Sequence, residues 1–317
     1  MVQWILWTPL IRINGWKMPS LLPVYRGRFA PSPTGPLHFG SLVTAVGSYL
    51  EAKSRSGEWL VRIENLDTAR EIPGASEEIL NTLYLLGMEW DGSVVYQNRR
   101  QDAYQAALRV LEKQDLIYPC SCSRKEIADS SVLGIEGPVY PGTCRDRKHE
   151  PEFSGAWRLC TNNDLIEFED AVQGIRQQRL QRDIGDFVIR RADGVFAYQL
   201  AVVVDDAEQG ITHVVRGGDL LNSTPRQIHL QKLLGYSTPS YMHLPVVVNT
   251  RGEKLSKQTQ AAPVDTSRPV LQLVKAIRFL GQTPPPEVSE SSLGSFWMWA
   301  TENWNREAIP KNMSLMF

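Results

Sequence analysis

The sequence lacks an apolar run long enough to cross a membrane. Its most apolar N-terminal stretch, residues 4–11, contains Pro9 and falls well short of the roughly 20 residues that a membrane span needs. Residues 1–24 also lack the basic leader and the small-residue cleavage site of a secretory signal. We therefore predict a cytoplasmic protein that makes no membrane contact. We interpret residues 1–24 as an N-terminal extension outside the fold, with Met18 as an alternative start, or as a docking tail.

An excess of charge of either sign is also missing. The 34 lysines and arginines nearly balance the 35 aspartates and glutamates, and the formal net charge is -1. This balance excludes a global electrostatic attraction to nucleic acid, so that any polyanion must be held by a local patch. The candidate patches are three basic clusters, at residues 123–125, 144–148 and 176–182.

Cysteine is scarce: the 317 residues include four cysteines, which are too few for a disulfide framework. Three of them, Cys120, Cys122 and Cys144, lie in one segment, and this clustering favours either reduced thiols or a metal site. Thiolates favour tetrahedral zinc, and three cysteines need one further oxygen or nitrogen donor. We expect Cys160, which lies outside the cluster, to be an ordinary buried thiol.

The common nucleotide-binding motifs are absent, since neither G-x-G-x-x-G nor the Walker spacing occurs between the first strand and helix. Residues 26–42 nevertheless place three prolines and a histidine, His38, before a helix. A loop that precedes a helix forms an anion site, because unpaired N–H groups and the helix dipole point toward it. Gly35 and Gly40 would let a ligand approach the backbone. The alternative is that the prolines only stiffen a turn.

Alternating strand and helix patterns predict an α/β fold with a parallel sheet. The predicted order is strand 24–30, helix 40–56, strand 58–67, helices 76–87 and 101–114, hairpin 186–206, helix from about 224, strand 243–249 and helix 270–281. Asp193 and Gly194 mark the hairpin turn, and Asp219 or Asn222 is the expected cap of the helix near residue 224. The loop-rich segment 119–160 interrupts the alternation, and we interpret it as an insertion.

A second motif, "EKLSK" at residues 253–257, changes the interpretation of the proline-rich loop. A lysine pair such as Lys254 and Lys257 can neutralise charge that develops on a transferring phosphate. The pairing of "PSPTGPLHFGS" with "KLSK" closely resembles the HIGH and KMSKS motifs of class I aminoacyl-tRNA synthetases, and "RFAPSPTG" is similar to the glutamyl branch. From about residue 26 to 281 the chain resembles the glutamyl-Q tRNA(Asp) synthetase family, a group of paralogues of the glutamyl-tRNA synthetase catalytic domain.

The resemblance implies a Rossmann-like class I synthetase catalytic domain with a small zinc-binding insertion. The expected division is an extension at 1–24, the two halves of the catalytic domain at 25–118 and 161–260, the insertion at 119–160 and a short helical tail at 261–317. Only 60 residues follow Lys257, which we interpret as too few for an anticodon-binding domain.

The implied activity is the joining of L-glutamate to ATP, with Mg²⁺, to give glutamyl-adenylate and pyrophosphate. The glutamyl group then passes to queuosine in the anticodon of tRNA(Asp), and the enzyme is expected to act as a monomer. Two alternatives remain, a conventional glutamyl-tRNA synthetase and an inactive paralogue that serves as a binding module.

The resemblance also assigns residues to the substrates. The planar guanidinium group of arginine can bind the side-chain carboxylate of glutamate through two hydrogen bonds, and an anionic side chain can bind its ammonium group. The residues that match the glutamate site are Arg28, Ser32, Glu64, Tyr198 and Arg216, and those that match the ATP site are His38, Gly40, Lys254 and Lys257. His38 and Lys257 are the expected catalytic residues, since Ser41 stands at the second histidine position of the first motif.

Three details complete the comparison with the family. Asn65 and Leu66 depart from the usual "RIEDTD", for which we expect a small local effect. Asp205 and Asp206 are expected to shape the nucleotide pocket and a strand end rather than to act as bases. The resemblance further implies one structural zinc per chain, and its ligands are Cys120, Cys122, Tyr140 and Cys144. His149 is the rival fourth ligand.

Overall fold

The first sheet of the protein is parallel and carries the N-terminal motif loop. The computed structural model describes residues 24–146, 155–255 and 261–316. The sheet has the order β1-β2-β3, with strands β1 (Arg26–Phe29), β2 (Glu58–Ile63) and β3 (Val95–Tyr96). Helices α1 (Phe39–Lys53) and α2 (Ala75–Leu85) connect these strands. The predicted α/β architecture is therefore confirmed for this part of the chain.

A second set of strands continues from the free side of β1. The backbone N–H of Thr212 donates to the carbonyl of Arg26 over 3.0 Å, which places β11 (His213–Gly217) beside β1. Strand β11 pairs in parallel with β12 (Ser240–Leu244), and β12 adjoins the antiparallel hairpin of β8 (Leu165–Asp170) and β9 (Gly174–Arg179). The carboxyl ends of β1, β2, β11 and β12 thus meet at one edge, where open α/β sheets bind ligands.

Helix α1 lies in the centre of the first hydrophobic core. Its residues Leu42, Val46 and Leu50 have no exposed surface. Their spacing places them on one helix face, and α1 packs against β1, β2, β11 and α8 (Pro269–Phe279). A side chain at Gly47 would begin 2.5 Å from Leu244 on β12, so glycine allows the helix to lie close to the sheet. This packing fixes the start of α1 at the edge where the strands end.

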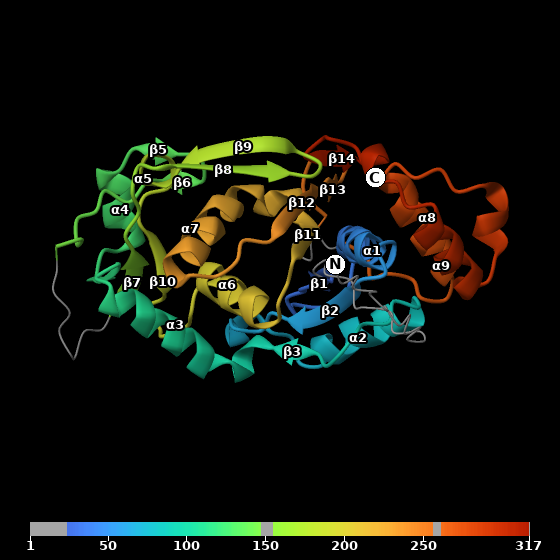
Figure 1. The fold of residues 1–317 in the computed structure, drawn as a ribbon, viewed down its shortest axis with the longest axis horizontal. Coiled ribbons are helices and arrows are strands. Elements are labelled where there is room, and N and C mark those ends of the chain that lie inside the picture. The colour runs from blue at the N-terminus through green and yellow to red at the C-terminus, as the bar shows by residue number, and fades with distance from the viewer. Residues whose placement is uncertain (1–23, 147–154, 256–260, 317) are drawn as a thin grey trace, which may run out of the picture.

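Three further helices lie beside a second, smaller sheet, which is antiparallel. In Figure 1 this sheet is at the opposite end of the molecule from α8. This sheet has the order β10-β7-β4, with strands β4 (Ile117–Cys120), β7 (Ala156–Leu159) and β10 (Phe187–Arg190). The helices beside it are α3 (Gln101–Lys113), α6 (Tyr198–Glu208) and α7 (Thr224–Leu234). The predicted insertion begins in β4 and ends just after β7, so both of its ends belong to this sheet. Between them lie α4 (Arg124–Ser130), β5 (Leu133–Gly134) and β6 (Gly137–Pro138), and α5 (Leu180–Asp183) follows β9.

Two local predictions are wrong. The turn at Asp193 and Gly194 exists, and Arg190 bridges to Phe196 across it, but the second predicted strand is helix α6. Its valines at positions 202–204 are each 1% exposed. A helix that is buried on all sides has the same continuous apolar pattern as a buried strand. Helix α7 begins at Thr224 after Ser223, whereas Asp219 and Asn222 lie in the preceding 3₁₀ turn and cap nothing.

The C-terminal residues fold back onto the first core. Helix α9 (Leu293–Glu302) is joined to α2 because the indole N–H of Trp297 donates to the carbonyl of Leu86 over 2.8 Å. A strand that the sequence did not predict, β14 (Ser314–Met316), pairs with β13 (Val246–Val248). Short 3₁₀ turns complete the described chain: η1 (Thr68–Arg70), η2 (Gln97–Arg99), η3 (Gly218–Ser223), η5 (Pro286–Glu290) and η6 (Arg306–Ala308). Among the described residues, no helix has both the length and the apolar character of a membrane span.

Two glycines test this C-terminal packing as a matched pair. Gly281 and Gly235 have φ angles of 77° and 71°. A Cβ at Gly281 would lie 2.0 Å from the carbonyl oxygen of Ala308, whereas a Cβ at Gly235 would meet nothing within 4 Å. We expect Gly235→Ala to lower the free energy of unfolding by about 1–2 kcal/mol, the cost of a left-handed alanine. Gly281→Ala should lower it by about 2–5 kcal/mol, because overpacking adds to that cost. Urea unfolding measures both, and equal losses would contradict the packing described.

Candidate active site

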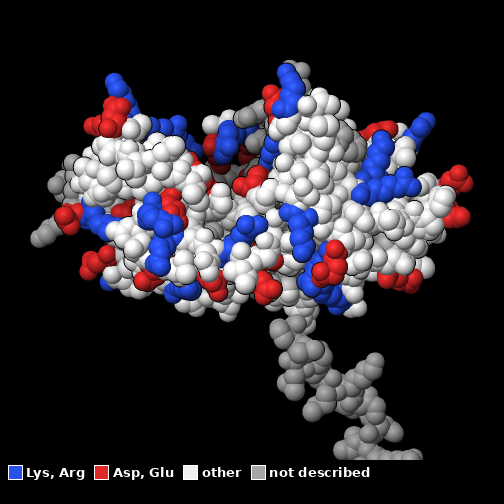
Figure 2. Space-filling model, turned by 90° about the horizontal axis from the view of Figure 1, so that it is seen from above, with Lys and Arg blue, Asp and Glu red and all other residues white. Residues whose placement is uncertain are grey.

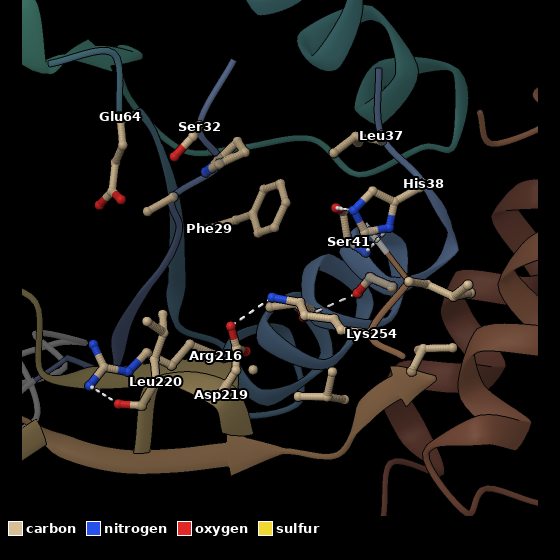
Figure 3. Close-up of a pocket in the computed structure, with 18 of the residues that line it drawn as sticks. Phe29, Ser32, Leu37, His38, Ser41, Glu64, Arg216, Asp219, Leu220 and Lys254 are labelled. Atoms are coloured by element: carbon tan, nitrogen blue, oxygen red, sulfur yellow. Dashed lines mark hydrogen bonds and ion pairs between the residues drawn. The ribbon is translucent and has the colours of Figure 1, made fainter. Parts of the chain in front are cut away.

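A cavity of about 710 Å³ lies at the edge where β1, β2 and β11 end. Figure 3 shows Glu64 and Arg216 on one side of this cavity and His38 with Ser41 on the other. The structure brings together these predicted residues in its lining: Arg28, Ser32, His38, Gly40, Glu64, Tyr198, Arg216 and Lys254. Lys257 lies outside the described residues, so its assignment remains a prediction. The two motif loops and the expected glutamate contacts therefore share one cavity.

Glu64 provides a nearly buried carboxylate at the end of β2. Its side chain is 10% exposed, and a nitrogen of Arg62 lies 3.3 Å from one of its oxygens. Burial raises the pKa of Glu64, and the charges of Arg62 and Arg28 oppose this shift only in part. A second cation in the cavity would stabilise the ionised form further. The site is thus suited to an ammonium group.

Arg28 presents one side of its guanidinium group to the cavity. Its side chain is 3% exposed, and its Nε and Nη2 donate to the two carboxylate oxygens of Asp206 over 3.1 and 3.4 Å. Within the described residues, Nη1 has no hydrogen-bond acceptor. Because guanidinium and carboxylate groups pair in a fork geometry, the remaining donors are placed to bind a second carboxylate.

Arg216 lies next to the end of β11 and donates all five of its N–H groups. Its Nε donates to His243 over 3.0 Å, and the other donors reach, at 2.8 to 3.4 Å, the acceptors Gln227, Thr224, Tyr198 and the carbonyl of Leu220. Tyr198 is the first residue of α6, and burial raises the pKa of its hydroxyl, which keeps it protonated. Arg216 is therefore held in one orientation before any ligand binds.

Asp205 and Asp206 do not lie where the sequence placed them. They belong to helix α6, not to a strand end, and neither lines the cavity. Asp206 instead joins Arg28 to Arg62, whose side chain has no exposed surface and whose Nη1 donates to Asp206 over 2.8 Å. Asp205 accepts from Gln97 over 2.8 Å and from other neighbours behind the cavity. The pair therefore holds Arg28 and Arg62 from behind the cavity, and the expectation that it lies at a strand end is wrong.

The first motif forms the beginning of helix α1. His38 is the N-cap residue, and its Nδ1 accepts the backbone N–H of Ser41 over 3.3 Å. The hydroxyl of Ser41 lies 3.1 Å from Nε2 of the same ring. A Cβ at Gly40 would lie 3.5 Å from the carbonyl oxygen of Leu255, which belongs to the second motif. The two motifs therefore lie in van der Waals range of each other at Gly40, and a Cβ there would also lie 3.2 Å from the ring of His38.

The second motif is anchored beside the first. Lys254 lines the cavity, and its Nζ donates to Asp219 over 2.6 Å. The backbone N–H of Leu255 donates to Val247 over 2.8 Å, and beyond residues 256–260 the N–H of Val264 donates to Leu37 over 2.9 Å. The described parts on both sides of the second motif are therefore attached at the cavity.

A second, smaller cavity of about 220 Å³ adjoins the first and shares Ser32, Glu64 and Tyr198 with it. Its wall contains Asn65 and Leu66, the two departures from the family pattern. Asn65 is buried, and its side-chain Oδ1 accepts the backbone N–H of Asn98 over 3.0 Å.

The three clustered cysteines lie together with Tyr140 in a small core of their own. The sulfur atoms of Cys120, Cys122 and Cys144 are within 4.8 Å of one another. The Tyr140 hydroxyl lies 3.3 Å from the sulfur of Cys120 and 3.7 Å from that of Cys122. Although burial opposes ionisation, hydrogen bonds from Tyr140 and the Ser121 backbone lower the pKa of Cys144 to about 7. This donor set fits a thiophilic metal ion. The rival ligand, His149, lies outside the described residues.

The predicted basic clusters differ in how far their side chains are exposed and free of ion pairs. Arg145 is engaged by Asp186 through two hydrogen bonds, the longer of 2.9 Å, so its role is structural. Residues 124 and 125 are exposed at the start of α4, and Arg176 is exposed on β9. Figure 2 shows basic and acidic side chains interspersed over one face of the molecule. On this face, therefore, basic side chains form no continuous surface.

Several residues that support the site were missed by the sequence analysis. Arg62, Asp170 and His243 are buried, and their hydrogen bonds lead to Asp206 and Arg216. Their only signal was a charged or polar residue within an apolar strand or at its end, and a single sequence does not show the partner of such a residue.

Comparisons with known proteins support the family resemblance that the two motifs indicated. The family described as tRNA synthetases class I (E and Q), catalytic domain, matches residues 25–287. A glutamyl-Q tRNA(Asp) synthetase of Dechloromonas aromatica is 55% identical over 294 residues, which cover 92% of this chain and 98% of that protein. One of Chromobacterium violaceum is 55% identical over 287 residues, which cover 90% and 96%.

A solved structure of a related enzyme also matches the chain, at lower sequence identity. A glutamate tRNA ligase from Elizabethkingia meningosepticum, in complex with its amino acid, superposes with a TM-score of 0.75 at 25% identity. The match covers 93% of this chain and 67% of that one. The chain therefore belongs to the class I tRNA synthetases (E and Q), in the branch of the glutamyl-Q tRNA(Asp) synthetases.

Proposed function

We propose that this protein activates L-glutamate with ATP and transfers the glutamyl group to queuosine in the anticodon of tRNA(Asp). The observation that carries the proposal is the shared cavity in which two arginines and a buried carboxylate face the two motif loops. The names of the relatives at 55% identity support the choice of acceptor.

In the proposed reaction, each end of glutamate meets its own partner. Arg28 and Arg216 bind the side-chain carboxylate, Glu64 binds the ammonium group, and Ser32 and Tyr198 add hydroxyl contacts. The α-carboxylate then points toward the start of α1, where it attacks the α-phosphorus of ATP. A P–O bond forms to glutamate, and the bond to pyrophosphate breaks.

The motif loops act on the phosphates. His38 and the first turn of α1 donate to phosphate oxygens, and Gly40 leaves room for the nucleotide. Lys254, together with Lys257 as predicted from the motif, offsets the charge that develops on the leaving pyrophosphate. Mg²⁺, when bound, would neutralise part of the triphosphate charge.

In the second step, a hydroxyl of the queuosine cyclopentenediol attacks the carbonyl carbon of the adenylate, and AMP leaves. We place this reaction in the cytoplasm, where ATP, tRNA and reduced thiols occur together. We also propose that the protein acts as a monomer.

Pyrophosphate exchange tests the activation step. We expect the purified protein to catalyse glutamate-dependent exchange of pyrophosphate into ATP without any RNA. Glu64→Gln should lower kcat/KM for glutamate by about 10- to 100-fold, because a charge-assisted hydrogen bond to the ammonium group is lost. Glu167→Gln makes the same chemical change at an exposed position of strand β8 and should have no effect.

The outcome separates the alternatives. Exchange that requires tRNA would favour a conventional glutamyl-tRNA synthetase. Folded, zinc-loaded protein that shows no exchange with or without tRNA would contradict the enzyme assignment. Transfer of labelled glutamate to tRNA(Asp) that contains queuosine, compared with the same tRNA lacking it, tests the acceptor.

We further propose that the cysteine cluster holds one structural zinc ion, with Tyr140 as the fourth ligand. Tetrahedral coordination at about 2.3 Å places sulfur atoms ~3.8 Å apart, and the sulfurs of Cys122 and Cys144 lie 3.5 Å apart. Arg158 supports the charge of such a site, since its Nε donates to Cys120 over 3.2 Å. Four protein ligands leave no position for water, so the role is structural.

Metal analysis tests the zinc site. We expect one zinc per chain in the purified protein, loss of zinc and a lower Tm in Cys144→Ala, and full zinc content in Cys160→Ala. Tyr140→Phe should weaken zinc binding by at least about tenfold, because one ligand is lost. If His149→Ala weakens zinc binding and Tyr140→Phe does not, the fourth ligand has been assigned wrongly.

A further inference from the structure

We propose that His243 is a positioning residue that fixes the orientation in which Arg216 receives the side-chain carboxylate of glutamate. This inference rests on the proposed function, because it assigns a task within the same glutamate site. It adds to that site a residue that does not line the cavity.

The hydrogen bonds of His243 determine its tautomer. Its Nε2 lies 3.0 Å from Nε of Arg216, and its Nδ1 lies 2.6 Å from a carboxylate oxygen of Asp170. A guanidinium nitrogen can only donate, so Nε2 must accept. The ring proton then sits on Nδ1 and is donated to Asp170. The imidazole therefore presents a lone pair to Arg216.

The surroundings keep this imidazole neutral. The side chains of His243 and Asp170 have no exposed surface. Burial lowers the pKa of His243 to about 4, although the hydrogen bond to Asp170 opposes this shift. Asp170 is itself fixed, because its Oδ1 accepts the backbone N–H groups of Val172 and Gln173 over 3.1 and 2.8 Å. The acceptor for Arg216 is thus available throughout the neutral pH range.

The contacts of Arg216 divide into two groups. The contacts to His243, Gln227 and Thr224 measure 3.0, 2.8 and 2.8 Å, and none of these three residues lines the cavity. The contacts to Tyr198 and to the Leu220 carbonyl are longer, at 3.3 and 3.4 Å, and both of these residues line it. Figure 3 shows the Leu220 contact at the cavity wall.

This division indicates which donors the substrate takes. A carboxylate can replace the two longer contacts while the three shorter ones remain. His243 is the one acceptor on Nε, and Nε lies at the junction of the side chain and the guanidinium plane. It therefore sets the angle of that plane, and a bidentate carboxylate contact depends on this angle.

Two amide substitutions separate the two nitrogens of the ring. His243→Gln can place an amide oxygen near the position of Nε2 and so keep an acceptor for Arg216. His243→Asn places its amide near Nδ1, which keeps the contact to Asp170 but removes that acceptor. In pyrophosphate exchange, we expect His243→Asn to raise KM for glutamate by about tenfold or more. KM for ATP should stay unchanged. Because His243→Gln keeps an acceptor for Arg216, its KM for glutamate should stay within about threefold of that of the unsubstituted protein.

The comparison also distinguishes a positioning role from a merely structural one. If His243 only fills space, both variants should lower Tm and leave KM for glutamate unchanged, and this result would overturn the proposal. Equal losses of glutamate affinity in both variants would overturn it as well. Should His243→Asn fail to fold, His243→Leu, which also removes the acceptor, takes its place beside His243→Gln. A tenfold rise of KM for glutamate in His243→Leu alone supports the proposal, whereas an unchanged KM in both variants, or a tenfold rise in His243→Gln, contradicts it.

Failure of the proposed function would look different. In that case the unsubstituted protein itself would show no glutamate-dependent exchange. Active protein whose KM for glutamate does not respond to His243→Asn would leave the proposed function intact and remove only the role of His243.

Discussion

The pairing of buried charges is the constraint on which the rest of this site depends. Glutamate brings two carboxylates and one ammonium group, so the cavity must present both signs while most water is excluded. A buried charge without a partner costs several kcal/mol. Arg28 and Arg62 therefore meet at Asp206, and Arg62 also reaches Glu64. These contacts set the geometry of the site before the substrate arrives, which lowers the cost of orienting it.

The parallel strands bring these charges together from distant parts of the chain. Arg28 lies on β1, Glu64 follows β2 and Arg216 lies on β11, and each is at the carboxyl end of its strand. Helix α6 supplies Asp206 from behind, and α1 supplies the anion-binding end. The C-terminal residues support the same edge, because β14 pairs with β13 next to the second motif. The fold thus places the proposed glutamate contacts and the proposed phosphate contacts on different sides of one cavity.

The sequence predicted the parts of this arrangement that depend on local pattern. The strands around Arg28 and Glu64, the cap region at His38 and the α/β class are confirmed, and the cysteines cluster with Tyr140. Helix α6 was mistaken for a strand, since its continuous apolar run has no helical period. The supporting network was not predicted, because the partners of a buried charge are set by tertiary contacts. Lys257 lies outside the described residues, and its role stays a prediction.

Calorimetric titration of L-glutamate into the purified protein, without ATP or tRNA, tests the central claim most directly. That claim is that one chain carries a preformed site for both charges of glutamate. It predicts one binding site per chain and much weaker binding of L-glutamine, whose neutral amide cannot pair with Arg28 and Arg216. Equal binding of the two amino acids, or no binding of glutamate until tRNA is added, would contradict it.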